Sequence, residues 1–318
     1  MNIFSMDCQI SIVTPVYYEE KSIVSFLERI EPVLEKISSN YEILFILDPC
    51  PDNTEAVILN EINRNPRIKL IVLSRRFGQP IATMAGITLC QGKYCVTIDV
   101  DLQDPPELIA EMYQKAIEGY DIVYTKRRTR KGETLVKKFI SYIGYTTINR
   151  LSEIKIPKDV GDYRMISRRV VDELKKINES HTYLRGLVAH IGFKQAYVEY
   201  DREERFAGKG KYNRFLGSIK IGLDGLISFG SKPLQFVSLL GASISLISFL
   251  IGFWYLLQKL FGVQLTPGLP TMVLAITFLS GVQLLCLGIV GEYIGRIYDE
   301  VKKRPLFIVD RFINKSEK

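Results

Sequence analysis

Short apolar runs alternate with amphipathic segments through the first two thirds of the chain. The apolar runs predict strands at 9–16, 41–47, 68–74, 93–99, 120–125 and 193–200. The segments between them, with apolar positions at helical spacing, predict helices at 22–37, 53–65, 79–90 and 106–119. The strand runs are continuously apolar, which is typical of strands buried on both faces. The pattern predicts a doubly wound α/β sheet, in which ligands bind at the carboxyl ends of the strands.

Two long segments near the C-terminus lack charge altogether. The 26 residues between Lys232 and Lys259 and the 32 between Lys259 and Glu292 contain no acidic or basic side chain. About 20 apolar residues span a bilayer as a helix, so we expect transmembrane helices at 234–257 and 270–292. The alternative, two very apolar core helices, is disfavoured because the segments follow each other directly after an ordinary soluble sequence.

Basic residues flank these two segments on one side of the expected membrane. They are Lys209, Lys211, Arg214, Lys220 and Lys232 before the first span, and Arg296, Lys302, Lys303 and Arg304 after the second. The connecting loop contains only Lys259. We therefore expect a protein of the cell inner (plasma) membrane. The positive-inside rule predicts that both of its termini lie in the cytoplasm. The N-terminus has no signal-peptide pattern, in agreement with a cytosolic first domain.

The expected organisation has four parts. Residues 1–211 form the cytosolic α/β domain, 212–233 juxtamembrane interfacial helices, 234–292 the transmembrane hairpin, and 293–318 a cytosolic C-terminal tail. A further amphipathic helix at 134–152 would pack on the domain, on the membrane or on a neighbouring subunit.

Composition narrows the kinds of partner and cofactor. The net charge is +7, but the basic residues concentrate beside the spans, which favours anionic lipid over nucleic acid. Five scattered cysteines without a CxxC pair indicate reduced thiols. His181 and His190 are the only histidines, so a zinc site is disfavoured.

The stretch "CVTIDVDLQDPP" at 95–106 concentrates acidic residues at the end of a predicted strand. Asp99 and Asp101 present two hard oxygen donors on one turn, and Gln103 adds a neutral oxygen. Mg²⁺ and Mn²⁺ accept one or two carboxylates together with substrate phosphates. Capping of the following helix is an alternative explanation for Asp104, but it does not explain Asp99 and Asp101.

Several motifs in order along the chain resemble a known family. "TPVYYEE", an Asp after the second strand, "SRRFGQPIATMAGI" and "DVDLQDPPE" look like family 2 glycosyltransferases of the GT-A (Rossmann-like) fold. "GDYRMISRRV", "ERFAGKGKY" and two C-terminal spans bring the resemblance closest to polyisoprenyl-phosphate glycosyltransferases, the group of dolichyl-phosphate mannose synthase and bacterial bactoprenol (undecaprenyl-phosphate) glucosyltransferases. The match covers nearly the whole chain, and the specific feature is the order and spacing of the motifs.

The resemblance implies roles for residues at matching positions. The implied donor-binding residues are Pro15, Tyr17, Glu19, Asp48, Gly78, Gln79 and Asp99. Asp99, Asp101 and Gln103 would hold the metal and the diphosphate. Where relatives often have Asp-Asp-Gly-Ser, this chain has "LDPC", so Asp48 is the only acid there. Arg76 stands where many relatives have Asn, and it receives no role.

"KDVGDYRMISRR" at 158–169 offers Asp159 and Asp162 as a catalytic carboxylate. Asp162 matches the family's acidic position, whereas Asp159 is expected to be a loop residue. The carboxylate would act as a base, orient the acceptor, or stabilise positive charge on the sugar. Arg164 would bind a phosphate or pair with an acid.

The segment "DREERFAGKGKY" at 201–212 precedes the first span. Arg202, Arg205 and Lys211 would bind donor or acceptor phosphate once the segment orders around Gly208 and Gly210. The alternative is an ordinary solvated charged face.

The resemblance implies a metal-dependent, inverting transfer of one hexose from a nucleotide sugar to a polyprenyl phosphate. UDP-glucose and undecaprenyl phosphate are the expected substrates, and GDP-mannose or a UDP-aminosugar are the alternative donors. The alternative class of protein is a non-catalytic membrane scaffold or sensor that binds a nucleotide sugar. A processive synthase is disfavoured because the sole tryptophan, Trp254, lies in the first span and no Gln-x-x-Arg-Trp motif exists. The small-xxx-small spacing of "GEYIG" at 291–295 is a hint of a homo-oligomer.

Overall fold

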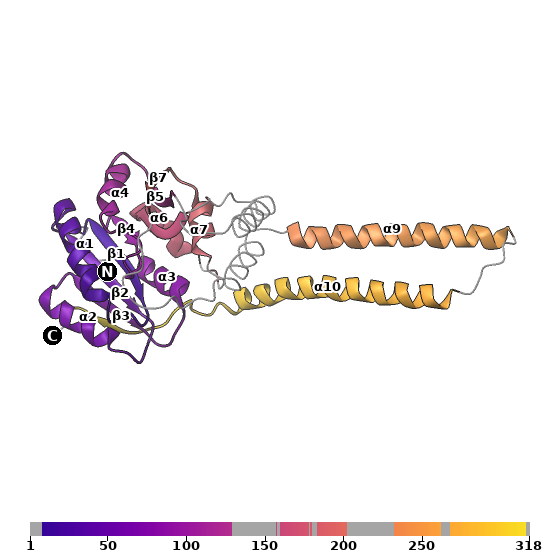
Figure 1. Ribbon diagram of the computed structural model, residues 1–318, viewed down its shortest axis with the longest axis horizontal. Coiled ribbons are helices and arrows are strands. Elements are labelled where there is room, and N and C mark those ends of the chain that lie inside the picture. The colour runs from indigo at the N-terminus through magenta and orange to yellow at the C-terminus, as the bar shows by residue number, and fades with distance from the viewer. Residues whose placement is uncertain are drawn as a thin grey trace.

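The computed structural model describes residues 8–128, 157, 160–177, 179, 183–201, 232–261 and 268–315. An α/β domain lies at one end, and two long helices run side by side away from it (Figure 1). The expected helix at 134–152 and nearly all of the interfacial segment 212–233 lie outside the described residues.

A single mixed sheet forms the centre of the α/β domain. Its strands are β1 Ile10–Val16, β2 Tyr41–Leu47, β3 Ile68–Leu73, β4 Tyr94–Thr97, β5 Ile122–Arg127, β6 Val160–Ser167, β7 Gln195–Tyr200 and β8 Val309–Ile313. They follow the order β7-β5-β6-β4-β1-β2-β3-β8. The strands β4, β1, β2 and β3 are parallel to one another, and β5 is parallel to β7, whereas β6 and β8 run antiparallel to their neighbours.

Helices cover both faces of the sheet, as the apolar strands require. The helices are α1 Ile23–Ile37, α2 Thr54–Arg64, α3 Gln79–Leu89, α4 Leu108–Ile117, α6 Arg168–Lys176 and α7 Leu184–Ile191. One apolar cluster joins α1, α2 and α4 to one face, and a second joins α3, α6 and α7 to the other. All seven residues of β2 are buried, which confirms the predicted two-sided burial of the strands.

The strand β6 has no counterpart in the predicted elements, and it changes the geometry of the domain. It lies between β4 and β5 and runs antiparallel to both. Thr97, at the end of β4, pairs with Arg164 in the middle of β6, and residues 160–163 extend beyond the end of β4. The amino end of β6 thus lies at the carboxyl edge of β4, where ligands bind in sheets of this kind.

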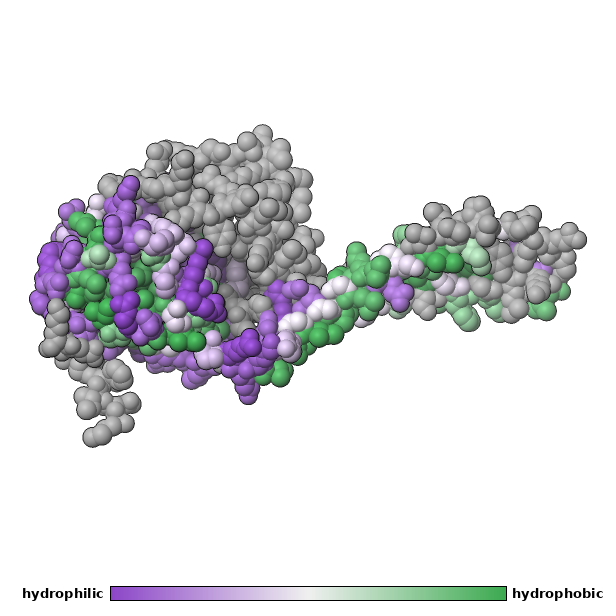
Figure 2. Space-filling model, turned by 90° about the horizontal axis from the view of Figure 1, so that it is seen from below, coloured by the Kyte–Doolittle hydropathy of each residue, from purple (hydrophilic) through white to green (hydrophobic). Residues whose placement is uncertain are grey.

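The long helices are α9 Lys232–Leu260 and α10 Leu269–Lys302. Among the described residues, Phe278–Lys302 is the one segment long and apolar enough to cross a membrane, and Val237–Ile251 is a shorter apolar stretch. Apolar side chains line the visible surface of α10, and hydrophilic ones gather where it meets the α/β domain (Figure 2). Both helices are longer than the spans expected at 234–257 and 270–292, and α10 continues through polar residues to Lys302.

The chain returns to the α/β domain after α10. There β8 pairs with the edge strand β3, and Ser74 N–H donates to the Ile308 carbonyl at 2.9 Å. Phe307 and Val309 pack against one apolar cluster of the domain and Ile313 against the other. Part of the segment expected as a C-terminal tail is therefore a strand of the central sheet.

Candidate active site

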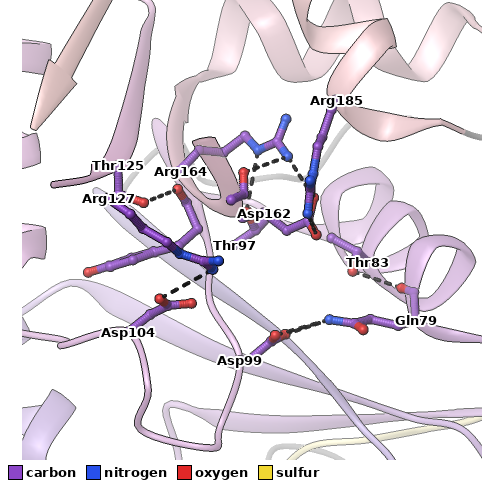
Figure 3. Close-up of polar contacts among 12 residues, drawn as sticks. Gln79, Thr83, Thr97, Asp99, Asp104, Thr125, Arg127, Asp162, Arg164 and Arg185 are labelled. Atoms are coloured by element: carbon purple, nitrogen blue, oxygen red, sulfur yellow. Dashed lines mark hydrogen bonds and ion pairs between the residues drawn. The ribbon is translucent and has the colours of Figure 1, made fainter. Parts of the chain in front are cut away.

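Side chains from α3, β6, α7 and the loop after β4 meet at one edge of the sheet (Figure 3). Gln79 begins α3, Asp99 and Asp101 follow β4, Asp162 lies near the start of β6, and Arg185 lies in α7. The edge is the one formed by the carboxyl ends of the parallel strands, as predicted.

The turn after β4 concentrates negative charge. The Gln79 side-chain amide donates to both oxygens of Asp99, at 2.8 and 3.1 Å. Asp101 is buried, and its Oδ1 accepts from the Gln103 backbone N–H at 3.1 Å. Leu102 between them has a φ of 57°, which an L-residue adopts at a cost and which often marks functional sites. Desolvation, followed by the charges of Asp101, Asp104 and Asp162, raises the pKa of Asp99 to about 8.

Burial is the main cause of this raised pKa, and the neighbouring carboxylates add negative charge around Asp99. No group of three or more His, Cys, Asp or Glu side chains converges as a metal site within the described part of the chain. The donor set of two carboxylates and an amide oxygen fits a hard divalent cation that completes its shell with phosphates and water. Asp99, Asp101 and Gln103 therefore remain the predicted metal ligands.

Asp104 does not cap the helix that follows it. The helix α4 begins after Glu107, and no side chain caps it. The Tyr200 hydroxyl donates a short hydrogen bond to Asp104, and Arg127 lies 3.8 Å from the same carboxylate oxygen. Asp104 thus connects the loop after β4 to the strands β5 and β7, and this contact explains its position in place of helix capping.

Two arginines hold the Asp162 carboxylate. Arg185 donates from Nε to Oδ1 at 2.9 Å and from Nη2 to Oδ2 at 2.8 Å, and Arg164 Nη2 donates to Oδ1 at 3.0 Å. The Asp162 side chain is 43% exposed, so desolvation opposes its ionisation only in part. Arg185 first, then Arg164 and Arg127, outweigh this effect and hold the pKa of Asp162 well below its usual range. Of the two roles open for Arg164, the structure shows pairing with an acid. Asp159 lies outside the described residues.

Sequence reasoning missed Arg185. It lies 23 residues beyond Asp162, inside the otherwise apolar helix "LRGLVAHI". The signal in the sequence was a single arginine within a mostly apolar stretch, and the structure shows Leu184, Gly186, Leu187 and Val188 of this helix buried.

The predicted donor-binding residues gather at the ends of β1, β2 and β3. Asp48 is 3% exposed, and it accepts from the backbone N–H groups of Phe77 at 3.0 Å and Gly78 at 2.8 Å. Gly78 has a φ of 94°, a conformation that favours glycine. Asp48 thereby fixes the loop that leads to Gln79.

The aromatic end of β1 lies beside that loop. Pro15 belongs to β1, and the Arg76 guanidinium lies 4.2 Å from the centre of the Tyr17 ring. Glu19 accepts a hydrogen bond from the Ser22 hydroxyl at 3.2 Å. The structure therefore brings Tyr17 next to Arg76, for which no role was predicted. Arg202, Arg205 and Lys211 lie outside the described residues.

Comparison with known proteins identifies the family. The family model described as Glycosyl transferase family 2 matches residues 11–175. The chain belongs to glycosyl transferase family 2. It is a glycosyltransferase, and both the resemblance drawn from its motifs and the GT-A type of α/β fold are confirmed.

Curated relatives match over almost their whole length. "Uncharacterized glycosyltransferase YkcC" of Bacillus subtilis is 44% identical, covering 96% of this chain and 95% of the relative. "Bactoprenol glucosyl transferase" of Shigella phage SfII is 36% identical, covering 95% and 98%. A crystal structure of glucosyl-3-phosphoglycerate synthase from Mycobacterium tuberculosis with Mn²⁺ and UDP-glucose matches at 16% identity and a TM-score of 0.46, covering 71% of this chain and 82% of that one. That similarity is too low for its ligands to bear on this chain.

Proposed function

We propose that this glycosyltransferase transfers a single glucose, with inversion, from UDP-glucose to undecaprenyl phosphate at the cytoplasmic face of the membrane. The observation that carries the proposal is the identity of 35–36% over 95% of the chain with relatives named for bactoprenol glucosyl transfer. Because the alignments cover 95% of this chain, they include both the α/β domain and the C-terminal helices.

The donor diphosphate would lie over the acidic turn. Asp99, Asp101 and Gln103 would hold Mg²⁺ or Mn²⁺, which when bound neutralises charge on the diphosphate leaving group. Gln79 already bonds Asp99 and would keep that carboxylate in place. Pro15, Tyr17, Glu19, Asp48 and Gly78 would line the nucleotide.

The acceptor phosphate would approach from the side of Asp162. A phosphate monoester is ionised near neutral pH, since its second pKa is about 6. The nucleophile thus needs little proton removal, and Asp162 would orient the acceptor or stabilise positive charge on the sugar. Arg202, Arg205 and Lys211 would bind phosphate from the segment before the first span.

The membrane arrangement in the proposal keeps the predicted four parts. Residues 1–211 would be cytosolic, 212–233 interfacial, 234–292 a two-span hairpin and 293–318 cytosolic. The apolar surface of α10 supports membrane attachment. An oligomer through the small residues at 291–295 stays a prediction.

The test uses the purified full-length protein in detergent with undecaprenyl phosphate and Mg²⁺ or Mn²⁺. Radiolabelled UDP-glucose, UDP-galactose and GDP-mannose are offered separately, and the lipid is extracted and counted. Label from UDP-glucose alone, abolished by EDTA, is the expected result. Label from another donor would refute glucose, and label that survives EDTA would refute metal dependence. Nucleotide binding without any labelled lipid would refute the proposed pair of substrates and point to another sugar or another lipid.

A further inference from the structure

The hydrogen bonds around Asp162 restrict what its carboxylate can do. Arg185 contacts both carboxylate oxygens, and Arg164 also contacts Oδ1 (Figure 3). A guanidinium that bonds two carboxylate oxygens at once does so in a single planar arrangement. Asp162 is therefore held in one orientation by three hydrogen bonds.

Rigid elements supply both arginines. Arg185 follows Leu184 in α7, and Leu184 and Leu187 are 5% and 1% exposed. Arg164 is fully buried within β6, which is paired on both sides. Site residues carried by helices and strands hold their geometry better than residues carried by loops. The pairing is therefore part of the built architecture of the site.

The charges around Asp162 come from four elements. Arg185 on α7, Arg164 on β6 and Arg127 on β5 favour the ionised carboxylate, whereas Asp99 after β4 has the opposite effect. The arginines dominate, and the pKa of Asp162 falls well below its usual range. Because base strength follows pKa, a carboxylate held in this way is a poor proton acceptor at neutral pH.

We propose that Arg185 is a positioning residue of this transferase, which acts through Asp162 by holding that carboxylate as a fixed negative charge at the site. Asp162 then works by its charge and orientation and does not take up a proton during transfer. This inference rests on the proposed transfer reaction but is independent of which sugar and which lipid are used.

A double-mutant cycle tests whether Arg185 acts through Asp162. The cycle compares Asp162→Asn, Arg185→Gln and the double variant in the full-length protein, by kcat and by the KM for the donor. We expect Arg185→Gln to lower kcat by about 10- to 100-fold, the usual loss when the partner of a site residue is removed, with little change in KM. The double variant should be no slower than Asp162→Asn alone, because the arginine has then lost its target. Arg64→Gln, which removes an arginine paired with Glu31 on α1, is the matched control and should keep wild-type activity.

A second measurement covers the case in which Asp162→Asn leaves too little activity to measure. The kcat and the donor KM of Arg185→Gln are then compared with those of the wild type. The loss should lie in kcat, because the hydrogen bonds that Arg185 donates within the site go to Asp162, which is not one of the predicted donor-binding residues. Arg185→Lys, which keeps the charge but not the two-point contact, should lose less activity and replaces Arg185→Gln should that variant fail to fold.

Two results would overturn the proposal. One is a double variant slower than Asp162→Asn by the full factor of the Arg185 loss, and the other is an Arg185→Gln loss that appears in the donor KM and not in kcat. Failure of the wild type with UDP-glucose and undecaprenyl phosphate is a separate outcome that concerns the substrates. The cycle then runs with whichever donor and lipid the wild type uses.

Discussion

At the scale of single residues, the site separates into an acidic side and an arginine-rich side. Asp99 and Asp101 follow β4, and burial, followed by repulsion from Asp101, raises the pKa of Asp99. Asp162 faces Arg185 and Arg164, which lower its pKa. Two carboxylates with opposite pKa shifts in one site point to different tasks.

Asparagine substitutions should separate these tasks. Asp101→Asn removes a charge from the predicted metal site, so we expect weaker metal-dependent binding of the donor nucleotide and loss of transfer. Asp162→Asn should lose transfer with donor affinity unchanged. Isothermal titration with UDP and Mn²⁺ measures the affinity of each variant, with Asp172→Asn on α6 as a control for charge removal. Equal donor affinity in the two site variants would contradict this division.

Asp48 offers a prediction about stability. Its two carboxylate oxygens accept the backbone N–H groups of Phe77 and Gly78. Asp48→Ala leaves both N–H groups without this acceptor. A buried donor without an acceptor lowers the free energy of unfolding by about 1–3 kcal/mol. We expect a lower midpoint of thermal unfolding and a higher KM for the donor, since the loop before Gln79 loses its anchor. Asp48→Asn keeps one acceptor and should lose less. An unchanged midpoint for both variants would show that the loop is held by other contacts.

At the scale of elements, two antiparallel strands define what is specific about this α/β domain. The strand β6 brings Asp162 to the carboxyl edge of β4, and β8 covers the edge of β3. An uncovered edge strand exposes unpaired N–H and C=O groups to other chains. The segment after α10 thereby completes the sheet and attaches the domain to the helix.

Removal of residues 305–318 tests the role of β8. Loss of the partly buried Phe307, Val309 and Ile313 should destabilise the α/β domain by about 3 kcal/mol, given 1.5–3 kcal/mol for each fully buried apolar side chain. The exposed edge of β3 should also promote aggregation. Thermal unfolding and size-exclusion chromatography in detergent measure both effects.

The matched control for this truncation is Arg311→Gln. Arg311 bonds Glu55 at 2.8 Å, but both side chains are well exposed, so the loss should stay below about 1 kcal/mol. A truncated protein as stable as the wild type would mean that β8 adds nothing to the domain.

At the scale of the whole molecule, the helices α9 and α10 extend from an otherwise compact domain (Figure 1). Exposed apolar residues such as Phe278, Leu284 and Leu285 line α10. An uncovered surface of this size marks contact with a membrane or another protein. The family match and the site residues lie in the domain, and the apolar surface of the helices supports the proposed membrane attachment.

Leu285→Arg tests the membrane assignment of α10. Arginine near the centre of a spanning helix costs about 3 kcal/mol on insertion scales, so the variant should shift from the membrane fraction or be degraded. Val301→Arg, near the end of α10, should remain in the membrane, because a long basic side chain there can reach the interface. Fractionation and immunoblotting measure the distribution. Equal distribution of both variants would contradict a membrane span in the apolar part of α10.

The sequence by itself determined which segments are buried and where the acidic turn lies. Apolar runs such as 41–47 became strands buried on both faces, and Asp99 and Asp101 followed a strand as expected. Periodicity and burial are local properties, so they can be read over a few residues. The order of motifs sufficed for the family because it is a property of the chain itself.

Only the tertiary structure decided which distant segments meet. The direction of β6, the pairing of Arg185 with Asp162 and the return of β8 to β3 join residues that no local pattern connects. The segment 160–167 carries a polar Asp162 and a buried Arg164, so its strand character depends on β4 and β5 on either side. Strand pairing and ion pairing across a core follow from packing of the whole domain, and this is why the place of the acidic turn after a strand could be predicted but the arrangement of the site could not.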